Sequence, residues 1–261
     1  MPATNTTEQP QLVEVQSSRI VHLAWMAMTV LVFASIVRHV LNYNFTNSVP
    51  AALTKLFNLN GEKTFAALFS TAILAFAAML LGLITLDAFK RGRQYVWHWF
   101  GLTIIFAYLA ADELLAIHEA ISRLIAKGSS IVGELTWALW VLPFGILVLV
   151  FGLVYLRFLM SLAPVYRIRF IIAGLVYVGG ALGFEIIGAM FVASYGGASI
   201  GHDILVILEE TLEMSGIILW ISALLTYLTN ETVGLTFTFT PLRDSSRVAI
   251  AETSIQKPET V

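Results

Sequence analysis

Cysteine is absent from this sequence of 261 residues. Its absence excludes disulfide bonds, thiolate metal sites and cysteine nucleophiles. Charge is scarce as well: Asp, Glu, Lys and Arg together make up 12% of the residues, against about 25% in a soluble domain. The formal net charge of −2 leaves no basic excess for a nucleic-acid partner. Hydrophobic residues make up 58% of the chain, a composition typical of a protein that lies in a lipid bilayer.

Six apolar segments are long enough to cross a bilayer as helices, since such a helix needs about 20 largely apolar residues. They cover residues 20–41, 64–86, 95–118, 134–157, 168–193 and 202–228. Only short loops separate them, so there is no room for a separate soluble domain. The sequence therefore predicts an all-α fold, a polytopic transmembrane helix bundle of about six helices that forms one domain over residues 20–229.

The two ends of the chain are polar. Residues 1–19 carry two acidic residues and a single basic one, Arg19, which fits neither a signal peptide nor a transit peptide. We expect the first helix to be an uncleaved anchor, preceded by a short cytoplasmic segment. Residues 230–261 are rich in Thr and Ser and are expected to form a disordered tail.

The basic residues predict how the bundle is oriented. Of the fifteen Lys and Arg residues, ten fall on the side that holds both termini and five on the opposite side. Because cytoplasmic loops carry the excess of positive charge, we expect both termini in the cytoplasm. The protein is predicted to be a multi-pass protein of a bacterial-type inner or plasma membrane. Trp140 then falls in the outer aromatic belt.

Ten of the seventeen acidic residues fall in or beside the predicted helices, towards one face of the bilayer. They are Glu62, Asp112, Glu113, Glu119, Glu134, Glu185, Asp203, Glu209, Glu210 and Glu213, with His118 and His202 among them. A carboxylate at the middle of a membrane costs roughly 2.5–3.5 kcal/mol. A chain that carries several is expected to use them, for a bound cation, a proton path or a catalytic site.

Helix rise and helix phase select a core from these residues. Asp112 and Glu185 lie on helices predicted to run outwards, and Glu209 and Glu213 on one that runs inwards. At 1.5 Å per residue, all four lie roughly 9–16 Å below the outer surface. His202 shares a helix stripe with Glu209 and Glu213 at 100° per residue. The sequence predicts a buried carboxylate and histidine site near the extracytoplasmic side.

Four further residues are alternates for this site: Glu113, His118, Glu119 and Glu210. Glu119 lies seven residues after Asp112, so we expect the two to share a helix face. Glu185 has a structural alternative, as a protonated side chain that holds two helices together by a hydrogen bond. Three acids fall at helix starts and are expected to act as caps: Glu62, Glu134 and Asp203.

A pair of small residues predicts where one helix meets a neighbour. Gly179 and Gly183 are four residues apart and so fall on the same side of the fifth helix. Such pairs let two membrane helices approach closely. We expect this pair to form the contact of the fifth helix with an adjacent one.

Several phrases of the sequence occur together in a known group of proteins. They are Leu59-Asn60-Gly61-Glu62, Asp112-Glu113 with His118-Glu119, and Glu209-Glu210 with Glu213-Met214. In these phrases the chain resembles a family of uncharacterised bacterial six-helix integral membrane proteins. The resemblance spans most of the membrane region. It implies the six-helix architecture and the importance of these positions, but no chemistry, because the family has no assigned activity.

A metal site is the first interpretation of the acidic cluster. Carboxylates and imidazoles suit Fe, Mn or Zn better than soft metals. The metal ligands would be Asp112, Glu185, His202, Glu209 and Glu213, and the metal would activate water or oxygen against a lipid-like substrate that enters from the bilayer. The Glu-x-x-His pairs of di-iron bundles are missing, so the residue types fit such a site but the spacing does not.

Two other classes of function remain open. Intramembrane carboxylates and histidines also serve proton- or cation-coupled transporters and channels, although the inner halves of the helices carry no matching acidic residues. A non-catalytic membrane subunit or receptor would use the acidic pocket to bind a cationic ligand or a partner helix. The sequence identifies no catalytic residue, and the oligomeric state stays open.

Overall fold

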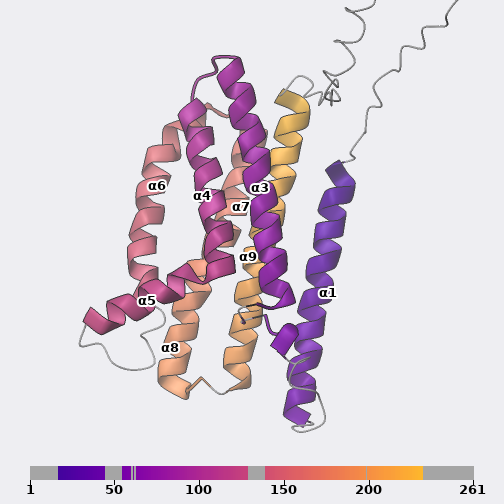
Figure 1. Cartoon of the computed structure of the whole chain (residues 1–261), viewed down its shortest axis with the longest axis vertical. Helices are drawn as coiled ribbons and strands as arrows, with labels where there is room; N and C mark the ends of the chain where they lie inside the picture. Colours follow the sequence, from indigo (N-terminus) through magenta and orange to yellow (C-terminus); the bar gives the residue numbers. More distant parts are fainter. Residues whose placement is uncertain are drawn as a thin grey trace, which may run out of the picture. The chain divides into compact units, whose positions relative to one another are not determined.

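The computed structural model describes residues 17–44, 55–59, 61, 63–128, 139–197 and 199–231. The regular secondary structure of these residues is helical, with no strand among them, as the sequence predicts (Figure 1). The elements are α1 (Ser17–Asn44), α3 (Phe65–Lys90), α4 (Val96–Leu115), α5 (Ile117–Gly128), α6 (Val141–Ser161), α7 (Pro164–Val178), the π-helical segment η2 (Gly179–Phe184), α8 (Glu185–Tyr195) and α9 (Ile200–Glu231).

The helices make this a multi-pass membrane protein. Five stretches of the described chain are long and apolar enough to cross a bilayer: α1, α3, α4, α6, and the continuous run from α7 through η2 to α8. The sixth predicted span corresponds to α9, which has 32 residues. It carries four acidic residues in its first half, and its length is sufficient to cross a bilayer.

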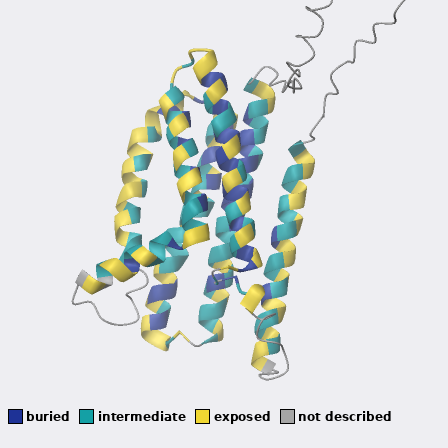
Figure 2. Cartoon of the chain, in the orientation of Figure 1, coloured by how far each residue is buried: buried dark blue, intermediate teal, exposed yellow. Residues whose placement is uncertain are grey.

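Many residues on the outer surface of the bundle are exposed (Figure 2), and large apolar side chains are common among them. Leu153 of α6 is 74% exposed and Phe33 of α1 is 66% exposed. Water would penalise such a surface, whereas the hydrocarbon core of a bilayer does not. The outward faces of α1 and α6 are therefore the lipid-contacting faces.

Helix α9 lies at the centre of the bundle, in contact with α1, α3, α7, η2 and α8. Its second half is mostly apolar and supplies fully buried side chains such as Ile218, Ile221 and Leu224. Its backbone also lies directly on α7. A Cβ atom added at Gly216 would lie 2.6 Å from the backbone nitrogen of Tyr177, so only glycine fits there.

The prediction that Gly179 and Gly183 form the close contact of the fifth helix is wrong. A Cβ atom added at either residue would meet nothing within 4 Å. The close approach is made by Gly180, where an added Cβ would lie 3.0 Å from Glu209 O and Glu213 N of α9. The reason is the π-helical turn of η2, in which the hydrogen bonds run from residue i to i+5 and the helix phase departs from 100° per residue.

A charge cluster holds the bundle together at the end where α9 finishes. Asp87 of α3 is only 7% exposed. Arg91 Nε donates to Asp87 Oδ1 at 2.7 Å, and Arg93 Nη2 lies 3.8 Å from Asp87 Oδ2. Arg93 also donates to the backbone oxygen of Glu231 at 2.6 Å. Two guanidinium groups therefore compensate this buried carboxylate.

The contact at Gly216 can be tested by substitution. Gly216→Ala should lower the melting temperature of the detergent-solubilised protein, because the added methyl group overlaps Tyr177 and overpacking costs about 1–3 kcal/mol. Gly179→Ala is the matched control, since its methyl group meets no neighbour within 4 Å. Equal melting temperatures for the two variants would contradict the close approach of α7 and α9.

Candidate functional site

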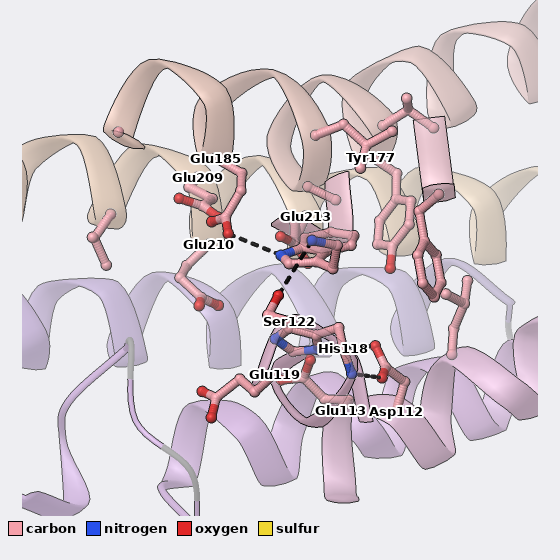
Figure 3. A pocket seen from close by; sticks show the side chains of 18 of the residues that line it. Asp112, Glu113, His118, Glu119, Ser122, Tyr177, Glu185, Glu209, Glu210 and Glu213 are labelled. Carbon is pink, nitrogen blue, oxygen red and sulfur yellow. Dashed lines mark hydrogen bonds and ion pairs between the residues drawn. The ribbon is translucent and has the colours of Figure 1, made fainter. Parts of the chain in front are cut away.

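One cavity of about 660 Å³ is lined by all nine residues that the sequence predicted for the site, the five ligands and the four alternates. It lies at the end of the bundle where α4 turns into α5 and α8 connects to α9, called here the α5 end (Figures 1 and 3). The selected residues that line it are Asp112, Glu113, His118, Glu119, Glu185, His202, Glu209, Glu210 and Glu213. Carboxyl groups from four helices thus face a single space.

The wall made by α4 and α5 is bent at Ala116. This residue has the left-handed φ of 49°, and α5 runs across the bundle instead of along it. Asp112 Oδ1 accepts the backbone N–H of His118 at 2.8 Å, so its carboxylate caps the first turn of α5. The expectation that Asp112 and Glu119 share a face of one continuous helix is wrong, because the helix ends between them.

Asp112 also makes an ion pair with the ring of His118. The second carboxylate oxygen, Oδ2, lies 3.0 Å from His118 Nδ1. Burial disfavours the protonated ring, but the hydrogen bond and charge of Asp112, together with the charges of Glu119 and Glu113, outweigh burial and raise the pKa of His118. The folded protein therefore holds the His118 proton to a higher pH than the unfolded chain does.

Trp140, directly before α6, makes hydrogen bonds to both α5 and α8. Its indole Nε1 donates to Glu185 Oε1 at 2.9 Å, and its backbone N–H donates to Ser122 Oγ of α5 at 3.2 Å. Its ring centroid also lies 5.3 Å from that of His118. The sequence placed Trp140 in an aromatic belt and did not single out Ser122 or Tyr177, because none of them belongs to a spaced pattern of acids.

The close approach at Gly180 brings Glu185 beside α9. Glu185 begins α8 directly after η2, and its carboxyl group lies close to that of Glu209. Both side chains line the cavity (Figure 3). The carboxyl group of Glu185 also accepts the indole N–H of Trp140.

Three polar groups of α9 that line the cavity have no hydrogen-bond partner among the described residues. They are the carboxyl groups of Glu210 and Glu213 and the ring nitrogen Nδ1 of His202. The nitrogen is buried. Buried polar groups in proteins are nearly always hydrogen-bonded, so this nitrogen needs an explanation, as do two carboxyl groups that receive no donor.

The side chains are not arranged as a metal centre. Within the described ranges, no three His, Asp or Glu side chains form a group that could hold a metal ion. Asp112 is engaged by His118 and Glu185 by Trp140. The five-residue ligand set therefore stays a prediction, which the arrangement of these side chains does not support.

Of the three acids expected to be caps, Asp203 falls within the described residues. Asp203 lies in the first turn of α9, as expected, but its carboxylate also contacts α1, where Oδ2 lies 3.0 Å from His39 Nδ1. Glu62 and Glu134 fall outside the residues that the structure describes. Asp203 is thus an acid of the α5 end that does not line the cavity.

Aromatic side chains fill the bundle beyond the cavity. The rings of Phe106 and Trp220 lie 5.2 Å apart, and those of Phe170 and Trp220 lie 4.9 Å apart. Trp99 continues the cluster, 6.2 Å from Phe170 and 5.0 Å from Tyr227. In this conformation the acidic lining ends at the aromatic layer.

A comparison with protein families assigns the chain to a group. The family described as a domain of unknown function, DUF8692, matches residues 23–227. The chain belongs to the DUF8692 family. The matched range includes the whole acidic lining of the cavity. No curated protein and no solved structure matches the chain. The function of this DUF8692 member is therefore argued from the cavity.

The contact between Asp112 and His118 should make stability depend on pH. The pKa of His118 is raised in the folded protein. The stabilisation that this contact gives the folded state is therefore fully present below the unfolded pKa of about 6.5 and is lost as the pH rises through the folded pKa. His118→Gln should remove this part of the dependence of the melting temperature on pH. His22→Gln, at the start of α1, should keep it. Identical pH profiles for His118→Gln and the parent protein would contradict the contact.

Proposed function

We propose that this DUF8692 protein is a membrane-embedded binding protein for a positively charged ligand, and that the acidic cavity is the binding site. The observation that supports the proposal most is the composition of the lining. Seven carboxyl side chains and two imidazoles face the cavity, against two basic side chains, Arg123 and Lys127. A surplus of this kind in a membrane bundle favours a cation.

The two basic residues lie at the rim of the cavity. Arg123 is exposed, and its Nη1 lies 3.0 Å from Glu119 Oε2, which is also exposed. Exposed pairs of this kind contribute little, and they leave the deeper carboxyl groups uncompensated. Glu210 and Glu213 therefore hold protons or a bound cation, because an unpaired buried carboxylate is too costly to persist.

The size of the cavity favours a molecule over a bare ion. Small-molecule sites in proteins have volumes of roughly 300–1,000 Å³, and the cavity of about 660 Å³ lies within this range. An organic cation can reach carboxyl groups on opposite walls at once. A single metal ion would have to draw them together.

A metal-dependent enzyme remains the narrower form of this proposal. Its support is the donor chemistry, since carboxylates and imidazoles suit Fe, Mn or Zn. It requires Asp112 to leave His118 and Glu185 to leave Trp140, because no three donors of the described chain are grouped for a metal. The metal would then act on a lipid-like substrate, as expected from the sequence. The present arrangement favours the organic cation.

The aromatic layer argues against a channel. A channel needs a continuous polar path, whereas Phe106, Phe170 and Trp220 pack against one another beyond the cavity. A transporter would have to separate these rings in a second conformation. With the predicted orientation, the cavity is a site on the extracytoplasmic side that ends inside the bilayer.

Binding can be tested with cations of different kinds. The full-length protein in lipid nanodiscs is titrated with MnCl₂, ZnCl₂ and butylamine at pH 7, with NaCl at matched ionic strength as the blank. We expect at least one cation to bind saturably, and the Glu210→Gln/Glu213→Gln double variant to weaken binding at least about tenfold, which corresponds to 1.4 kcal/mol. Asp203→Asn, an acid of the α5 end outside the cavity, should leave the affinity unchanged.

Two results would contradict the proposal. One is the absence of saturable binding for every cation, and the other is an equal effect of Asp203→Asn and the double variant. Metal content of the purified protein separates the two forms of the proposal. Stoichiometric Fe, Mn or Zn that is lost in Glu209→Ala/Glu213→Ala would select the metal form.

A further inference from the structure

The lining of the cavity contains two kinds of side chain. The acidic residues come from α9 and from parts of α4, α5 and α8. The apolar residues, called here the apolar wall, come mainly from α4, α6, α7 and η2. Its residues include Leu109, Phe144, Val148, Val178, Ala181 and Leu182. A site for a small inorganic cation gains nothing from such a wall, whereas a ligand with an apolar part is stabilised in proportion to the apolar area it buries.

We infer that the ligand is an amphiphilic amine, with its ammonium group between Glu210 and Glu213 and its apolar chain against the apolar wall. This inference rests on the proposed function and names the class of ligand. An ammonium group has three N–H donors and no acceptor. It is the chemical complement of two neighbouring carboxyl groups that have no other donor.

The geometry of α9 places the two acids for this role. Glu210 and Glu213 are three residues apart on one helix, a spacing at which side chains are neighbours. Both lie inside the bundle, face the cavity and receive no hydrogen bond from the described chain. The buried Nδ1 of His202 also lacks a partner there. The absence of hydrogen-bond partners at these three groups is therefore evidence that does not depend on the number of acidic residues.

Helix α6 separates the apolar wall of the cavity from the lipid. Phe144 and Val148 of α6 line the cavity, while Ile146 and Leu147 of the same helix are 58% and 60% exposed on the outside. A molecule that dissolves in the bilayer is therefore concentrated next to the apolar wall. A small hydrophilic cation has no such advantage.

A series of amines tests the inference on the full-length protein in lipid nanodiscs. Butylamine and octylamine differ by four CH₂ groups, and octanol has the apolar chain without the charge. Signals from empty nanodiscs are subtracted to remove partitioning into lipid. We expect octylamine to bind at least about tenfold more tightly than butylamine, and octanol to show no saturable binding.

Two variants test the two kinds of lining residue separately. Glu210→Gln/Glu213→Gln should abolish the advantage of octylamine over octanol, because the ammonium group loses its partners. Val148→Asn should reduce the difference between octylamine and butylamine, because the chain then meets a polar side chain. Leu153→Ala is the control on α6, since Leu153 is 74% exposed on the lipid-facing side and should leave both ratios unchanged.

The outcomes distinguish this inference from the proposed function. If butylamine or MnCl₂ binds as tightly as octylamine, the apolar wall has no role and the inference is wrong, while cation binding stands. If no cation binds, both are wrong. Saturable binding of octanol with the affinity of octylamine would also overturn both. The chain-length series uses the unchanged protein, so the test does not depend on the folding of any variant.

Discussion

The whole arrangement depends on one constraint: a helix that carries four acidic residues in its first half must be shielded from the hydrocarbon of the bilayer. Helix α9 meets this constraint by lying at the centre, with α1, α3, α7, η2 and α8 around it. Its mostly apolar second half then forms the packed core, where Ile218, Ile221 and Leu224 are fully buried. The same central position directs the acids of its first half towards α4, α5 and α8. Burial of the core and formation of the cavity are thus two consequences of one placement.

Close backbone contacts fix the distance between the walls. Gly216 allows α7 to pack directly on α9, and Gly180 allows η2 to pack on α9 nearer the α5 end. The π-helical turn of η2 contains Gly180 and directly precedes Glu185, so it changes the helix phase at the start of α8. Such turns are common at functional sites in helices. Because the carboxyl group of Glu185 lies close to that of Glu209, a local irregularity of the backbone affects the chemistry of this part of the cavity.

Much of the site could be predicted from the sequence, because depth in a bilayer follows from helix rise alone. This is why Asp112, Glu185 and Glu209 were expected at one level, and they do line one cavity. Helix phase was less reliable, since it assumes an unbroken α-helix. The break at Ala116 depends on the contact of Asp112 with His118, and the turn of η2 depends on packing against α9. The first is a local capping contact and the second a tertiary contact, and no periodicity in the sequence records either of them. Trp140 was missed for the same reason, because its role comes from partners 18 and 45 residues away.

The two ends of the bundle treat a buried acid differently, and the contrast bears on function. At the end opposite α5, Asp87 is compensated by Arg91 and Arg93, so its charge serves the structure and is satisfied within the chain. Glu210 and Glu213 receive no such partner from the described residues, and both line the cavity. If these acids served only to hold helices together, arginines placed as they are around Asp87 would stabilise the bundle further. Unpaired carboxyl groups around a cavity destabilise the fold and stabilise no contact within the chain. A bound cation would supply the missing donors and remove this destabilisation, so the uncompensated acids are better explained by binding than by folding.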